Sequence, residues 1–215
     1  MITSLLGLIN ANLLELIITI WKNFSLRVNN NRSVSLNDIS KNIITGKTPS
    51  TYNKDNYGKD IPFVKIPDMH NKIFIIETAQ YLSKNGALSQ KSKFIPSNSI
   101  IVSCIGTPGL VSITTQEVQT NQQINSIVID KKYLYYIFLE LRMLRDQINV
   151  LGSGGTTIKN LNKKDFSNIS IQLPDENELV RFNCTVNPLF QKIYANSLQS
   201  QKLLGIKNEI LTKLF

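Results

Sequence analysis

The chain has 215 residues, of which 42% are hydrophobic, and it carries a formal net charge of +9. This length fits one domain, or one domain with an appendage, and the composition supplies enough apolar side chains for a core. A single histidine and two distant cysteines, Cys104 and Cys184, exclude a zinc cluster and do not require a disulfide. The basic excess favours an anionic partner.

Residues 1–32 are predicted to form an N-terminal packing helix. Apolar side chains recur at spacings of three and four, as in a helix that packs on another helix. They are Leu6, Ile9, Leu13, Leu16 and Ile20. A signal peptide or membrane anchor is the alternative, but no basic segment precedes the apolar run and polar residues interrupt it. We therefore expect a soluble helix and no membrane partner.

Residues 33–174 are predicted to form an α+β domain in which strands dominate. Short β-rich runs such as IPFVKI, SIIVSCIG, LVSITT and NSIVID are separated by Gly, Pro, Asn and Asp. A helix is expected over about residues 132–150, ending at a GSGG loop. A short helix and a strand are expected between that loop and Pro174.

Residues 175–215 are predicted to be a helical spacer that forms a coiled coil and a dimer. Acidic residues fill the first turn of PDENELVRF, which suits a helix N-terminus. The apolar stripe then continues through Leu189, Ile193, Leu203, Ile210 and Leu214. Pro188 is expected to break or kink this helix near Asn187.

Motifs of common enzymes are missing from the sequence. There is no GxxxxGK[ST] loop, GxGxxG fingerprint, GxSxG elbow or adenine methyltransferase motif. A metal-dependent nuclease would need clustered carboxylates, and the candidates are Asp55, Asp60 and Asp68. Their spacing matches no known metal-ligand pattern. The sequence therefore predicts no catalytic residue, cofactor or metal.

Three stretches carry a resemblance to a known family. Residues 36–69 contain a Gly-x-Thr-Pro-Ser turn from Gly46 to Ser50, followed by Tyr57-Gly58 and Ile-Pro-Phe-Val. TNQQIN follows at residues 120–125, and GSGGTTIKNLNKKDFSNISIQLP closes the segment at 152–174. Together they resemble a target recognition domain of a type I restriction-modification specificity subunit. Residues 9–24 and 182–215 are similar to the family's conserved helices.

The resemblance implies a non-catalytic subunit that reads double-stranded DNA in the prokaryotic cytoplasm while methyltransferase and restriction subunits act on it. The family's full subunit has two recognition domains, and this chain has room for one. It therefore implies a half-subunit that pairs with a second copy or with another specificity subunit. The chain also departs from the family at Glu176-Asn177, where Glu-Gln is frequent.

Candidate DNA-binding residues lie in three loops and are Asn, Gln, Lys or hydroxyl side chains, the usual ligands of bases and phosphates. They are Lys47, Thr48, Ser50, Thr51, Lys54, Lys59, Lys65, Asn121, Gln122, Gln123, Thr156, Thr157, Lys159 and Asn160. Each loop also has a plain structural interpretation. GKTPS is equally a strand-locking turn, TNQQIN a polar turn bonded to nearby backbone, and GSGGTT a helix stop.

The sequence is also compatible with two other functions. A truncated interaction scaffold would keep the helical seams and lose DNA binding. A small metal-dependent nuclease would use the three aspartates. Loss of affinity with salt separates a DNA reader from a scaffold, because each neutralised phosphate releases counterions.

Overall fold

A computed structural model describes residues 2–28, 31–145, 148 and 161–214. The chain divides into two compact units, a helical unit of residues 1–30 with 174–215 and an α/β unit of residues 31–173. The predicted α+β class is confirmed.

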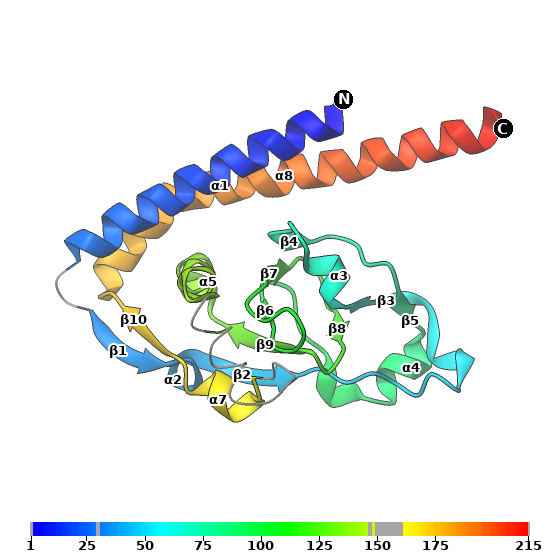
Figure 1. Cartoon of the computed structure of the whole chain (residues 1–215), viewed down its shortest axis with the longest axis horizontal. Helices are drawn as coiled ribbons and strands as arrows, with labels where there is room; N and C mark the ends of the chain where they lie inside the picture. Colours follow the sequence, from blue (N-terminus) through cyan, green and yellow to red (C-terminus); the bar gives the residue numbers. More distant parts are fainter. Residues whose placement is uncertain (1, 29–30, 146–147, 149–160, 215) are drawn as a thin grey trace. The chain divides into compact units, whose positions relative to one another are not determined.

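The helical unit consists of α1 (Ile2–Arg27) and α8 (Glu176–Leu214), which lie side by side (Figure 1). The Asn196 amide donates to Asn10 Oδ1 at 2.8 Å, and the rings of Phe24 and Phe182 lie 4.9 Å apart. The two helices are therefore antiparallel, and both contacts give the same alignment of residues along them. At that register Ile2 lies opposite about residue 204, so the last ten or so residues of α8 run past α1.

The expected break at Pro188 is absent, since α8 is one continuous helix with Pro188 inside it. Proline in a helix interior costs about 3 kcal/mol, because a hydrogen bond is lost and the ring crowds the preceding turn. Val186 and Phe190, on either side, are fully buried. Packing of these side chains outweighs the local cost of the proline.

The face of α1 that packs on α8 agrees with the predicted one only in part, since Leu6 is buried and Leu13 and Ile20 are half-buried. Ile9 and Leu16 are exposed, whereas Ile17 is fully buried. Ile17 lies seven residues from both Asn10 and Phe24, on the same side of the helix. The buried seam is therefore centred on Asn10, Ile17 and Phe24, and a polar residue in it shifted the sequence-based register.

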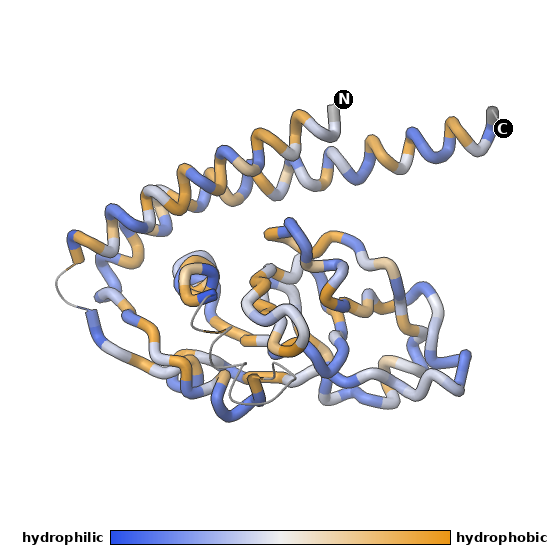
Figure 2. The backbone as a smooth tube through the Cα atoms, viewed as in Figure 1, coloured by the Kyte–Doolittle hydropathy of each residue, from blue (hydrophilic) through white to orange (hydrophobic). Residues whose placement is uncertain are grey.

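Along α8, the predicted stripe is buried only in its first part. Ile193 is buried and Leu189 and Leu203 are half-buried, but Ile210 is exposed. The side chain of Leu214 lies outside the described residues. Figure 2 shows hydrophobic residues continuing along α8 beyond the end of α1.

The α/β unit is built on a five-stranded sheet in the order β2-β9-β6-β7-β4. Its strands are β2 (Ser40–Thr45), β9 (Ile124–Ile129), β6 (Ile100–Ser103), β7 (Val111–Thr114) and β4 (Phe74–Ile75). All neighbours are antiparallel except β4 and β7. Ile101, Val64, Ile95 and Val118 are fully buried members of its core.

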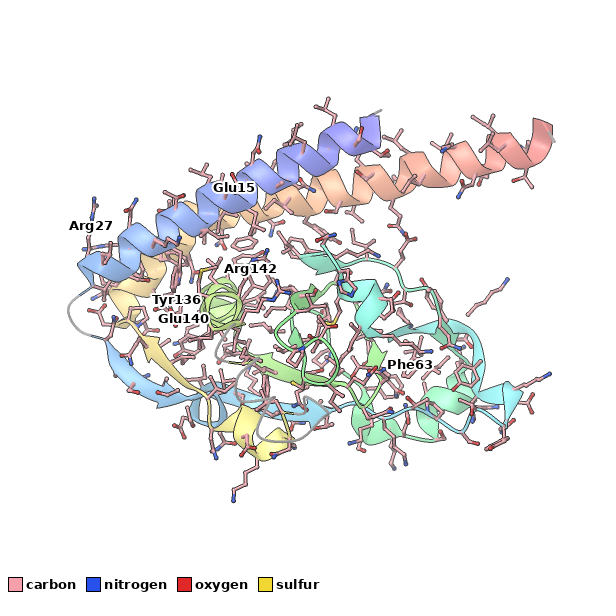
Figure 3. All side chains as sticks on the ribbon, viewed as in Figure 1. Glu15, Arg27, Phe63, Tyr136, Glu140 and Arg142 are labelled. Carbon is pink, nitrogen blue, oxygen red and sulfur yellow. The ribbon has the colours of Figure 1, made fainter. Side chains whose placement is uncertain are left out.

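Two smaller sheets complete this unit. The three-stranded sheet has the order β5-β3-β8. Its strands are β5 (Tyr81–Leu82), β3 (Tyr57–Val64) and β8 (Gln119–Thr120). Phe63 of β3, labelled in Figure 3, packs with Leu82 and Ala87 in a second core. β1 (Arg32–Ser35) pairs with β10 (Ser170–Leu173) and brings the ends of the unit together.

Short helices connect the strands. They are α2 (Leu36–Ile39), α3 (Ile66–Met69), α4 (Lys84–Leu88), α7 (Lys163–Ser167) and the 3₁₀ turns η1 (Lys54–Asn56), η2 (Lys91–Lys93) and η3 (Lys131–Tyr133). Ser35, Ser83 and Asn162 cap α2, α4 and α7 by accepting a backbone N–H with the side-chain oxygen.

The helix expected at 132–150 is present as α5 (Leu134–Met143), preceded by η3. The Tyr136 hydroxyl donates to Gln172 O at 2.7 Å. Burial, followed by the charge of Glu140 on the same helix (Figure 3), raises the pKa of Tyr136. Tyr136 therefore anchors α5 to β10.

Candidate nucleic-acid interface

The Gly46–Ser50 turn lies directly on the β8–β9 turn. Gly46 N donates to Ile124 O at 3.1 Å, and Lys47 N donates to Thr120 O at 2.9 Å. A Cβ atom on Gly46 would lie 2.1 Å from Asn121 O, a contact that side chains do not make. The glycine is therefore required because two backbone segments approach closely.

The two turns are also joined through their side chains. Thr48 Oγ1 donates to Gln122 Oε1 at 2.7 Å. Gln122 is otherwise exposed, and Lys47, Ser50 and Thr51 are exposed on the neighbouring turn. Lysine, hydroxyl and amide groups from segments about 70 residues apart are thus gathered at one place.

Asn121 is occupied within its own turn. Its side chain is 7% exposed, its Oδ1 accepts from Gln123 N at 3.2 Å, and its Nδ2 donates to Gln123 Oε1 at 2.8 Å. For Asn121, the structure therefore agrees with the interpretation of TNQQIN as a polar turn whose side chains bond to nearby backbone. Asn121 holds the turn that presents Gln122 and Gln123.

A third loop, Ile105–Gly109 between β6 and β7, lies next to Gln123. Cys104 N donates to Gln123 O at 2.8 Å, and the Gln123 amide nitrogen is 3.9 Å from where a Cβ on Gly106 would lie. Gly106 and Gly109 have φ of +77° and +87°, which favours glycine. The exposed tip at Gly106 and Thr107 was not expected from sequence, although the IGTPG string is a turn signal.

The remaining candidate lysines are spread over the unit. Lys54 and Lys59 are exposed on η1 and β3. Lys65 is half-buried, with its ammonium 5.6 Å from the centroid of the Phe63 ring. The Lys65 side chain is therefore positioned by Phe63 of β3, and not by the three loops that meet at Gln122 and Gln123.

The GSGGTT loop, with Thr156, Thr157, Lys159 and Asn160, lies outside the described residues. The chain is described again from Leu161, whose N–H donates to Cys104 O at 2.9 Å. Asn125 Nδ2 donates to Leu161 O at 3.4 Å and to the Cys104 thiol at 3.3 Å. Leu161 is thus anchored beside the β6–β7 loop.

The three aspartates considered for a metal have separate structural roles. Asp68 accepts the backbone N–H groups of Lys65 and Ala79, each at 2.9 Å. Asp60 accepts from Lys84 N at 3.0 Å, and Asp55 lies in η1. Among the residues that the structure describes, no group of three His, Cys, Asp or Glu side chains is placed to hold a metal.

Charge is concentrated in the α/β unit. Residues 31–173 contain 17 Lys and Arg against 10 Asp and Glu, which accounts for +7 of the net +9. A hollow of about 590 Å³ lies instead on the helical unit, where Arg27, Asp175 and Glu178 line it with apolar residues. The polar loops carry exposed residues and line no described pocket, which suits contact with a large anionic surface better than enclosure of a small ligand.

Family comparison gives a match over residues 29–213 to the type I restriction modification DNA specificity domain. The chain is 44% identical over 183 residues to the HindI specificity subunit of Haemophilus influenzae, covering 84% of this chain and 40% of the relative. It is 26% identical over 175 residues to the MjaIX specificity subunit of Methanocaldococcus jannaschii, covering 79% and 38%. The chain thus spans about 40% of the length of these relatives.

Solved structures show the same fold. The S subunit of a type I restriction-modification system from M. genitalium has a TM-score of 0.67 and 16% identity. The alignment covers 99% of this chain and 56% of that one. The HsdS subunit from Thermoanaerobacter tengcongensis has a TM-score of 0.57 and 15% identity, with coverage of 99% and 53%. At these identities the likeness concerns the fold alone.

Proposed function

The chain belongs to the family of type I restriction modification DNA specificity domains, and from that premise we propose that it reads a DNA half-site without catalysing a reaction. The convergence of three polar loops at one place on a basic α/β unit is the observation that supports this most directly. We assign residues 33–174 to DNA recognition, and residues 1–32 and 175–215 to assembly.

Recognition divides between two kinds of side chain. Gln122 and Gln123 are suited to read a base edge, because a side-chain amide donates and accepts at once and matches adenine. Lys47, Thr48 and Ser50 are suited to bind phosphates. The other candidates are proposed as peripheral contacts: Thr51, Lys54, Lys59, Lys65, Thr156, Thr157, Lys159 and Asn160.

The helical unit is proposed to join the chain to its partners. We propose that a second copy of the chain, or another specificity subunit, pairs with it and supplies a second recognition unit. Exposed Leu204, Ile206, Ile210 and Leu211 on the last part of α8 provide apolar surface for that pairing. Methyltransferase subunits, with restriction subunits, would dock on the same helices in the prokaryotic cytoplasm.

The recognition proposal is tested by co-expressing the chain with the methyltransferase subunit of its own system and mapping the methylated DNA sites. We expect one sequence motif, and steep loss of DNA affinity with salt. Replacing Gln122 and Gln123 by Ala should alter or abolish the motif, whereas the exposed Gln116→Ala on the same unit should not. Stable pairing without DNA binding would favour the scaffold alternative.

The pairing proposal is tested by measuring oligomeric state with light scattering. The double variant Ile206→Ser and Ile210→Ser should shift a dimer to monomer, while the exposed Lys207→Ser between them should not. Truncating α8 after residue 204 should change the spacing between methylated half-sites or abolish pairing. An unchanged dimer with unchanged spacing would contradict this role of the helix.

A further inference from the structure

Tyr52 presents an aromatic ring to solvent on the loop between β2 and β3. Its side chain is 98% exposed. A tyrosine that packs in a protein usually removes 150–250 Å² from water, roughly the contact area that an aromatic anchor contributes to an interface. Isolated exposed apolar groups are common, so exposure alone carries no function. The surroundings of Tyr52 supply the argument.

The loop is fixed on both sides of Tyr52. Before it, Pro49 O accepts the hydroxyl of Tyr57 at 3.1 Å and Ser50 O accepts the amide of Asn56 at 2.9 Å. After it, Asn53 Oδ1 accepts Asp55 N at 3.1 Å and caps η1. The ring is therefore held out on an ordered loop, and binding through it requires little further ordering of the chain.

A second segment, Ser83–Lys93, packs along the same loop. Ser83 N donates to Asn56 O at 3.0 Å, and a Cβ on Gly86 would lie 2.0 Å from that same oxygen. At its other end, the buried Gln90 donates its amide to Lys47 O at 2.9 Å. This segment is thus attached to both ends of the loop that carries Tyr52.

The two attached segments are rich in lysine. Residues 46–60 and 83–93 hold six lysines and two aspartates: Lys47, Lys54, Lys59, Lys84, Lys91, Lys93, Asp55 and Asp60. The Asp60 carboxylate is already bound to Lys84 N. An exposed ring within such a basic surface matches a polyanion with apolar faces, since lysines meet phosphates and the ring meets bases or sugars.

We propose that Tyr52 is a DNA-contacting residue whose ring packs against bases and deoxyribose in a groove, while lysines of the Ser83–Lys93 segment bind the flanking phosphates. The inference rests on the proposed function and adds residues to it. Tyr52, Lys84, Lys91 and Lys93 extend the interface from the three loops onto the loop between β2 and β3 and onto α4 and η2. Lysines are depleted at the centres of protein–protein interfaces, so a ring on lysine-rich segments favours DNA over a protein partner.

The test is DNA affinity of the full chain, with its methyltransferase partner, across a salt series. Tyr52→Ala should weaken binding roughly ten-fold without changing the slope of log Kd against log salt, because an apolar packing contact displaces no counterions. Tyr52→Phe should retain most of the affinity. Lys91→Ala should weaken binding less and reduce the slope by about one.

Leu88→Ala is the matched control, since Leu88 is an exposed apolar residue on the same segment. It should bind as the unchanged chain does. Equal affinity of Tyr52→Ala and the unchanged chain would overturn this inference and leave the proposed function standing. A loss of methyltransferase association instead of DNA affinity would also overturn it. An unchanged chain that binds no DNA would overturn both proposals.

Discussion

The two units differ in what they do with apolar surface and charge. The α/β unit buries apolar side chains in cores such as those around Ile101 and Phe63 and carries +7, with its polar loops at the surface. The helical unit carries only +2, buries one seam, and leaves Leu5, Leu8, Leu16, Ile206 and Ile210 exposed. One unit therefore has the surface of a polyanion binder, and the other has apolar surface left for another helix.

Replacing glycine by alanine should change the stabilities of the two units in opposite directions, which is the largest difference that we expect between them. Gly46→Ala places a methyl group 2.1 Å from a backbone oxygen and should destabilise the α/β unit by about 3 kcal/mol, with loss of DNA binding. Gly7→Ala in α1 meets nothing within 4 Å and should stabilise the helical unit by about 0.5–1 kcal/mol. Denaturant unfolding followed by hydrogen exchange measures both.

Trp21, the only tryptophan, lies in α1 and reports on the helical unit. Its fluorescence transition should stay in place in Gly46→Ala if the units unfold separately. A parallel shift of both transitions would show that the two units unfold as one.

Within α1, adjacent residues should differ sharply. Ile17→Ala removes a fully buried side chain and should cost about 2 kcal/mol, at the low end for such changes because two helices readjust easily. Leu16→Ala, at a residue 48% exposed, should cost less than about 0.5 kcal/mol. Trp21 fluorescence at low protein concentration measures both. If both variants lost the same free energy of unfolding, Ile17 would pack no more tightly than Leu16, and this would support the register that the sequence predicted.

A smaller effect is expected from the polar contact in the seam. Asn10→Ala leaves the buried Asn196 amide without its acceptor and should cost about 1 kcal/mol. The exposed Asn12→Ala on the same helix should be neutral or slightly stabilising, because Ala is the better helix former. The same unfolding assay compares them, and a neutral Asn10→Ala would mean that the contact does not fix the register.

The sequence was sufficient where the pattern was local. Short β-rich runs predicted β6, β7 and β9, and the Gly-x-Thr-Pro-Ser turn predicted a constrained loop. The sequence was insufficient for α1, because two sets of residues on this helix have spacings of three and four, and either set could pack on α8. Only the partner Asn196 shows that Asn10 belongs in the seam.

Long-range contacts explain the rest. No local pattern places Ser83–Lys93 beside the loop of Tyr52, since the buried Gln90 makes that connection across 43 residues. Asn121 was predicted as a DNA ligand from its type and its position beside two glutamines. Its burial and its bonds to Gln123 depend on the packing of β8 and β9, which composition does not reveal.

The two cysteines, one in each unit, should differ in the reactivity of their thiols. Cys104 lies buried in the α/β unit, and burial raises the pKa of its thiol from 9.0 to about 12, whereas Cys184 is exposed on α8. Because the thiolate is the reactive form, a maleimide at pH 8 should label Cys184 quickly and Cys104 only as the α/β unit opens. Unfolded Cys104 ionises near its ordinary pKa, so the stability of this unit should fall as pH rises from about 9 to 12. Cys104→Ser should reduce that loss of stability, leaving the part due to Tyr136, whose pKa burial also raises, and it should remove the slow labelling phase. Fast labelling of both native thiols would contradict the burial of Cys104.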